Sequence, residues 1–214
     1  LTYAASNQQH DSLSALLSVG INTNKVDDRN RTALRIAAEN GDYESVRALL
    51  NHHANPELHG KNGDTALILA VRNNHTRVAR LLLAKGAKPD TANNSYWTPV
   101  MYAASRGNLK MLSLLLEQNA NPNTQNHNGW TPLMLAARSG NALAVSTLLH
   151  HGADVRITSS DRRSALYVAR EYKHKEAAQI LLNSGAEKLS APVPSGKREK
   201  NTSRSSGNAK NKKS

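Results

Sequence analysis

Tryptophan and arginine are the residue types whose placement in this chain points most directly to a chemistry. Both tryptophans, Trp97 and Trp130, stand immediately before a threonine and are 33 residues apart. Three arginines, Arg72, Arg106 and Arg138, lie in the same stretch. Truncating such residues in an interface often costs about 2 kcal/mol or more, and a guanidinium can donate two hydrogen bonds to one carboxylate. The pattern favours contact with a protein segment that is acidic or that offers an aromatic or apolar anchor.

Patterns for catalysis or metal binding are missing. The chain has no cysteine, which excludes disulfides, thiolate metal sites and cysteine nucleophiles. Its nine histidines include the pairs at 52–53 and 150–151, but neighbouring helix residues diverge by about 100 degrees and no carboxylate pair matches them. There is no Gly-rich phosphate loop, no HExxH and no serine elbow. We therefore expect a non-enzymatic protein with no catalytic residue, no metal and no cofactor.

Positive charge is concentrated at the C-terminus. The net charge is +12, and residues 190–214 hold seven Lys or Arg against Glu199 alone. This segment is rich in Ser, Asn and Gly and predicts a disordered basic tail. A solvated tail is the favoured interpretation, and the alternative is a nuclear-import signal or binding of nucleic acid or anionic lipid by counterion release. The basic residues are Lys197, Arg198, Lys200, Arg204, Lys210, Lys212 and Lys213.

The remainder of the chain repeats itself every 33 residues. Thr32, Thr65, Thr98, Thr131 and Ser164 mark the period, and two leucine columns begin at Leu16 and Leu17 and recur through six copies. A period of this length indicates one supersecondary unit copied end to end, with each copy burying its apolar face against its neighbours. No stretch approaches the roughly 18 apolar residues needed to span a membrane. The sequence predicts an all-helical solenoid that is not transmembrane.

Each repeat predicts two helices and a hairpin. In the fourth copy, Thr98 and Pro99 open a helix that runs to about Arg106, and Gly107 turns the chain into a second helix. That helix ends at Asn119, where other copies place glycine and the second copy places His53. Polar turns, such as residues 61–63 and 127–129, then suit a projecting hairpin.

The repeat at residues 129–154 resembles an ankyrin repeat. The motifs that carry the resemblance are Gly129-Trp130-Thr131-Pro132-Leu133, Leu135-Ala136-Ala137, Gly140, Leu148-Leu149 and Gly152-Ala153-Asp154. The chain departs from the family at the histidine that follows Thr-Pro-Leu, so the hydrogen bonds which that histidine makes between loops are not expected here. The positions concerned are Arg35, Ile68, Met101, Met134 and Tyr167.

The resemblance implies a fold of helix-turn-helix pairs with projecting β-hairpin loops. The last copy carries Lys173, Lys175, Glu176 and Gln179 and looks like a polar cap. The predicted divisions are a truncated first repeat at 1–30, repeats at 31–63, 64–96, 97–129 and 130–162, a capping repeat at 163–189, and the tail at 190–214. We number the repeats 1 to 6 in this order.

The resemblance also implies a concave face, formed by the hairpin tips and the exposed side of the first helices, that grips another protein. Trp97 and Trp130 are expected to form one aromatic step beside Tyr96, because neighbouring helices pack about 8–10 Å apart. A structural role, with each ring lying over its own hairpin, stays open. The predicted contact residues are Arg31, Asp64, Arg72, Tyr96, Trp97, Arg106, Trp130, Arg138 and Arg163.

The sequence thus predicts a scaffold for protein–protein interaction that binds a partner segment on the concave face. Two alternatives remain: association with nucleic acid or an acidic membrane through the tail, and a targeting module of a larger enzyme or effector whose catalytic part lies upstream. We expect an intracellular, cytoplasmic monomer; nuclear, bacterial-envelope and host-delivered locations stay open.

Overall fold

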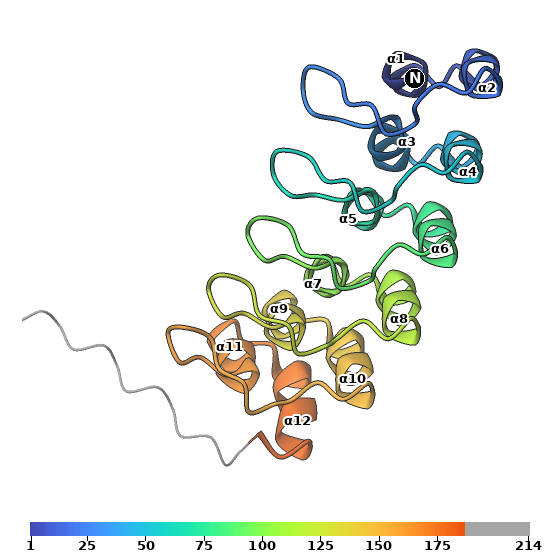
Figure 1. Ribbon diagram of the computed structural model, residues 1–214. Helices are drawn as coiled ribbons and strands as arrows, with labels where there is room; N and C mark the ends of the chain where they lie inside the picture. Colours follow the sequence, from blue (N-terminus) through green and yellow to red (C-terminus); the bar gives the residue numbers. More distant parts are fainter. Residues whose placement is uncertain (187–214) are drawn as a thin grey trace, which may run out of the picture.

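The computed structural model describes residues 1–186, and Figure 1 shows them as two parallel stacks of short helices with loops projecting from one side. Each repeat contributes one helix to each stack. The expected all-helical repeat architecture is confirmed. The first helices are α1 (Thr2–Ser6), α3 (Ala33–Asn40), α5 (Ala66–Arg72), α7 (Pro99–Ser105), α9 (Pro132–Ser139) and α11 (Ala165–Glu171), and the second are α2 (His10–Ser18), α4 (Tyr43–Asn51), α6 (Thr76–Ala84), α8 (Leu109–Glu117), α10 (Ala142–His150) and α12 (Lys175–Asn183).

The first helices of repeats 2 to 6 begin and end close to the predicted residues, although the Thr98 side chain makes no capping hydrogen bond. The Thr32 side chain accepts a hydrogen bond from the Arg35 backbone N–H, and Thr131 does the same for Met134. Gly41 and Gly140 end their helices with φ of 73° and 70°, a conformation that glycine adopts without strain. Helices of this length are unstable alone in water, so packing between repeats must hold them.

Small residues let the first helices approach closely. Ala37, Ala70, Ala104 and Ala137 are fully buried between successive helices of this stack. The leucine column that runs from Leu49 to Leu181 is likewise fully buried along the second stack. The result is one continuous core along the solenoid, which each repeat completes only by contact with its neighbours.

Polar contacts link repeats at the turn between the two stacks. The His174 ring donates from Nε2 to the carbonyl of Arg138, and His75 donates to Glu39 in the same way, both at 3.0 Å. In the first repeats, His10 Nε2 lies 3.0 Å from the Asp42 carboxylate. Burial alone would raise the pKa of Asp42, but hydrogen bonds from Ser45 and His10 outweigh it and lower that pKa.

The projecting loops form without strands in the described part of the chain; one isolated bridge joins Val26 and Thr32. A backbone hydrogen bond closes the base of each loop, as from Asn93 N–H to the Trp97 carbonyl at 3.0 Å, and a side-chain oxygen adds to it. The Asn93 Oδ1 accepts from the N–H groups of Ser95 and Trp97, each at 3.0 Å. Asn126 holds its own loop in the same way. Hydrogen bonds from nearby backbone N–H groups to an Asn side-chain oxygen fix tight turns.

Arg35 supplies contacts that were not expected where the family histidine is replaced. Its Nε donates to the carbonyl of Asp64 at 2.9 Å, and its Nη1 donates to that of Asn30 at 3.0 Å. The guanidinium fills the space beside Gly60, where any Cβ would collide with it. Burial lowers the pKa of Arg35, while the nearby Asp64 raises it. The Arg35 guanidinium therefore joins the loop that precedes α3 to the loop that precedes α5.

The last helix pair has the polar outer surface expected of a cap. Arg170 is exposed at the position where Ala38, Val71 and Ala137 are buried in earlier repeats. Lys173, Lys175, Glu176 and Gln179 are exposed as well. Among residues 1–186, no helix is both long and apolar enough to cross a membrane. The predicted tail at 190–214 lies outside the described residues, and the repeat boundaries stay predictions.

Candidate protein-binding face

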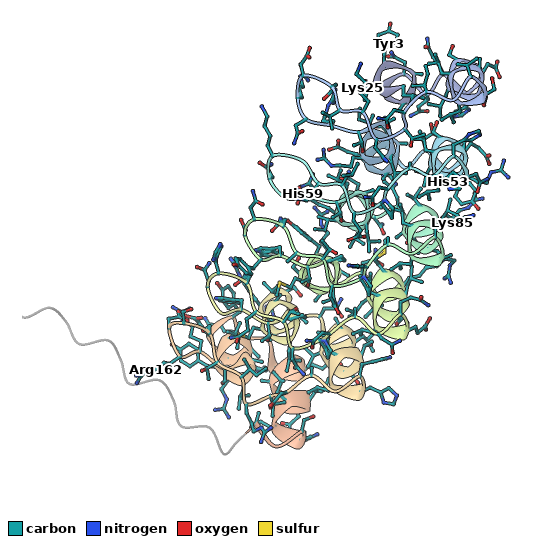
Figure 2. All side chains as sticks on the ribbon, viewed as in Figure 1. Tyr3, Lys25, His53, His59, Lys85 and Arg162 are labelled. Atoms are coloured by element: carbon teal, nitrogen blue, oxygen red, sulfur yellow. The ribbon has the colours of Figure 1, made fainter. Side chains whose placement is uncertain are left out.

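The predicted contact residues lie at the loops and at the ends of the first helices, but they fall into three groups. Some form ion pairs and some pack as aromatic rings. Arg106 and Arg138 have no acidic partner among residues 1–186. Figure 2 shows the loop side, with Lys25 and Arg162 on the outer loops, whereas His53 and Lys85 lie beside the second stack.

Asp64 is not a surface contact, contrary to the prediction. Its side chain is buried, with the residue only 3% exposed. Oδ2 accepts from Arg72 Nη1 at 2.7 Å, and Oδ1 accepts from Asn93 Nδ2 at 2.9 Å. Arg72 Nη2 also lies 3.7 Å from Glu39. Asp64 and Arg72 therefore form an ion pair within repeat 3 that reaches Glu39 of repeat 2, and the charge of Arg72 is balanced in place.

The same network includes Tyr102, which the sequence analysis missed. Asn93 Nδ2 donates to the Tyr102 hydroxyl oxygen at 3.1 Å. Burial raises the pKa of Tyr102, and the negative charge of Asp64 raises it further. The phenol therefore stays protonated and serves as a packing residue.

Arg31 and Arg163 are also neutralised locally. Arg31 Nε donates to Asp27 Oδ2 at 2.9 Å, and Arg163 lies within 2.6 Å of Asp161 and 2.9 Å of Glu171. Burial would raise the pKa of Asp27, but its hydrogen bonds with Arg31 lower it. Both arginines stiffen the loops at the two ends of the face and offer little free charge.

The aromatic residues do not form the single step that was predicted. Trp97 packs on Tyr102 of its own repeat, with ring centroids 4.9 Å apart, and no ring contact joins it to Trp130 among the described residues. Trp97 thus packs against the first helix of its own repeat, and Trp130 lies beside Arg138. Both rings remain only half-buried, so each keeps an open side.

Tyr96 is the most exposed aromatic at the centre of the face. It is 56% exposed and stacks edge-on against His127, with centroids 4.4 Å apart. Its φ is 59°, in the left-handed region that neighbouring loops reach with Gly63 and Gly129. A bulky residue in this conformation is strained, and such strain is common at binding sites.

Arg106 and Arg138 remain without an acidic partner. Among residues 1–186, no carboxylate lies within 4.0 Å of either guanidinium. Arg138 is held over two rings, with its Cζ 5.7 Å from the centroid of Trp130 and 5.6 Å from that of Tyr172. Tyr172 was missed because only the stacking of repeat 6 on repeat 5 brings it there. The face thus has a pre-positioned cation at its centre.

A pocket of about 220 Å³ opens beside Arg138. Its position can be read from a column that runs Glu39, Arg72, Ser105, Arg138 and Glu171, one residue per repeat. Serine is the smallest member, so the column has a gap at repeat 4. The sequence analysis did not single out this gap, although the column contained the signal. The lining residues are Trp97, Ser105, Leu135, Arg138 and Ser139.

The histidines and carboxylates of the described residues do not gather into a metal site. Residues 1–186 bring together no group of three or more His, Asp or Glu side chains that could hold a metal ion. His52 and His53 are exposed, as are His150 and His151. The basic residues from Lys197 onward lie outside the described part of the chain.

Comparison with known proteins gives the family. The sequence family described as ankyrin repeats (3 copies) matches residues 1–93, 53–126 and 100–191. A search of curated proteins finds no match. The crystal structure of an ankyrin repeat domain from Acinetobacter baumannii AYE is similar, with a TM-score of 0.82 and 25% identity over 86% of this chain and 96% of that one.

The chain therefore belongs to the ankyrin-repeat family. Ankyrin repeats are generally non-catalytic modules for protein–protein interaction, and no enzyme family is indicated.

Proposed function

We propose that this protein is a scaffold that binds a segment of another protein on the concave face of repeats 3 to 6. The supporting observation is that neither Arg106 nor Arg138 has a carboxylate partner among residues 1–186, while every other predicted arginine has one. An unpaired guanidinium beside half-buried tryptophans matches the composition of binding hot spots.

The dimensions of the face fit this role. A stable interface buries about 800 Å² on each partner, which three or four adjacent repeats can supply. Arg72 and Arg163 mark the ends of such a stretch, and their ion pairs hold the loops around it. A rigid loop array lowers the ordering cost of binding, so most of the contact energy is available for affinity. The partner segment is acidic or carries an aromatic or apolar anchor.

The test is affinity capture from a cell lysate with the full chain, compared with the double variant Trp97→Ala/Trp130→Ala. The variant should lose the captured partner, identified by mass spectrometry, while keeping the helical circular dichroism signal. Tyr3→Ala is the matched control, because Tyr3 is 74% exposed at the far end of the array (Figure 2).

A chain ending at residue 189 separates the contribution of the basic tail. Protein capture should survive this truncation if the concave face is the binding site. Capture that persists in the tryptophan variant, or that disappears with the tail, would instead assign binding elsewhere.

A further inference from the structure

The pocket beside Arg138 has the size of a receptor for one side chain. At about 220 Å³ it is several times larger than the roughly 30 Å³ that one water occupies. It is smaller than the roughly 300–1,000 Å³ of pockets that hold small molecules or cofactors. A single side chain of a bound segment is the occupant that this volume favours. We call this pocket the notch, defined by Trp97, Ser105, Leu135, Arg138 and Ser139.

The walls of the notch are chemically apolar. Trp97 contributes an aromatic ring, and Leu135 is 4% exposed at its base. The two serine hydroxyls are already engaged, since Ser105 donates to the Tyr102 carbonyl at 3.0 Å and Ser139 donates to that of Ala136 at 2.9 Å. Neither hydroxyl has a free proton to donate to a polar group of a ligand. An apolar side chain is therefore the group that binds most favourably in the notch.

The rim of the notch is cationic. The stem of Arg138 lines it, and its guanidinium lies over Trp130 and Tyr172. These contacts limit the motion of the side chain and so reduce the entropy lost when a carboxylate binds. A carboxylate next to the apolar side chain would meet the charge of Arg138. Arg106 is exposed in the preceding repeat, at the position equivalent to Ser139.

We propose that the notch and Arg138 together read a short motif in the partner protein: one apolar side chain with an Asp or Glu within two positions of it. Consecutive Cα atoms are about 3.8 Å apart, and alternate residues of an extended segment share a face, so both groups can reach their sites at once. This motif rests on the proposed function, because it specifies which segment the concave face selects.

A nucleic acid fits this site less well than a peptide. An aromatic ring and two arginines could stack a base and bind phosphate. However, one face of Trp97 is packed against Tyr102, and both serine hydroxyls of the notch are already engaged, so Arg138 is the one notch side chain left to donate to the edge of a base. Charge and apolar walls together favour the acidic, apolar segment, and nucleic acid becomes an outcome of the test.

The experiment selects a library of displayed random twelve-residue peptides against the full chain. The enriched pool should carry an apolar residue with Asp or Glu within two positions. A synthetic peptide from that pool is then titrated calorimetrically against three variants: Ser105→Met, which fills the notch, Arg138→Gln, which removes the cation, and Arg80→Gln, which removes an exposed charge from the second stack as a control.

Ser105→Met and Arg138→Gln should each weaken the peptide by about tenfold or more, and Arg80→Gln should leave affinity unchanged. Replacing the acidic residue of the peptide by its amide should weaken binding to the wild type by a similar factor and have little further effect on Arg138→Gln. Equal thermal midpoints for all variants establish that folding is intact.

If the peptides bind Ser105→Met and Arg138→Gln as tightly as the wild type, or if the enriched pool lacks the motif, this assignment is overturned. If those peptides are still lost in Trp97→Ala/Trp130→Ala, the concave face binds protein and only the motif is wrong. If they are indifferent to that variant too, or if nothing is enriched, the proposed function fails with it. A twelve-residue oligothymidylate that binds the wild type and is lost in Ser105→Met would assign the notch to nucleic acid instead.

Discussion

Repeats 2 and 3 differ from repeats 4 and 5 in what their arginines do. In the earlier repeats, Arg35 bonds to two loop carbonyls, and Arg72 is paired with Asp64 and Glu39. In the later repeats, Arg106 and Arg138 have no acidic partner among residues 1–186. Arg72 and Arg138 occupy equivalent places in a 33-residue period, yet one belongs to the scaffold and the other is available to a ligand.

The comparison shows that residue type alone does not mark a binding site in a repeat protein. A guanidinium that is paired and half-buried contributes to stability, and removing its partner leaves an unsatisfied group. A guanidinium held only by aromatic faces keeps its capacity for a carboxylate. Function is therefore expected where the scaffold has left charge unbalanced.

The largest effect should come from removing the buried carboxylate of Asp64, which accepts hydrogen bonds from Arg72 and Asn93. Asp64→Ala deprives Arg72 and Asn93 of their acceptor and should lower the free energy of unfolding by about 2 kcal/mol. Glu171→Ala is the control, because its pair with Arg163 is exposed to solvent, and it should cost less than about 1 kcal/mol. Urea unfolding followed by circular dichroism measures both. Equal losses would remove the distinction between buried and surface pairs.

A smaller effect tests whether Arg35 and Gly60 act as a unit. Gly60→Asn installs the residue found at the equivalent positions in repeats 3 and 4, Asn93 and Asn126, and its side chain must displace the Arg35 guanidinium. The loss of two hydrogen bonds should cost about 1–2 kcal/mol. Adding Arg35→Met, the residue type at position 101, should recover part of that loss. A double-mutant cycle by chemical denaturation reports the coupling, and additive effects would contradict the explanation.

The smallest effect is a dependence on pH confined to the first repeats. The pKa of Asp42 is lower in the folded chain than its usual value, so the carboxylate stabilises the fold above that usual value and the contribution disappears as the pH falls through the lowered pKa. Mild acid should open α2 and α4 before α8 and α10. Hydrogen exchange between pH 5 and about pH 3 would show the order. In Asp42→Asn, the difference between the two regions should shrink.

Several features of the fold could be predicted from the sequence because they depend on local rules. The 33-residue period, the buried alanines and the capping role of Thr32 follow from helical spacing and from the preferences of individual residues. The sequence also placed His53 at a helix end where other copies have glycine. His53 adopts a φ of 62° there, the left-handed conformation that Gly20 and Gly86 adopt in their copies. These features need only neighbours along the chain or the equivalent residue of the next copy.

The candidate site could be predicted only in part. The sequence placed Trp97, Trp130 and Arg138 in one region, but it treated Asp64 as exposed and the two tryptophans as stacked. Those errors concern side-chain orientation, and an orientation depends on which of several nearby groups gives the better contact. Trp97 packs against Tyr102 of its own repeat, and Asp64 accepts hydrogen bonds from Arg72 and Asn93.

By itself, the sequence determined a helical solenoid, because each copy of a regular 33-residue period can bury its apolar surface only against the next copy, and the motifs of residues 129–154 gave the resemblance to ankyrin repeats. Only the tertiary structure decided which charges were used in holding that solenoid together. Each arginine pairs with whatever carboxylate or carbonyl the stacked repeats bring within reach. The Arg138 guanidinium lies over the rings of Trp130 and Tyr172 and has no carboxylate within 4.0 Å among residues 1–186. It therefore keeps its capacity to bind a carboxylate.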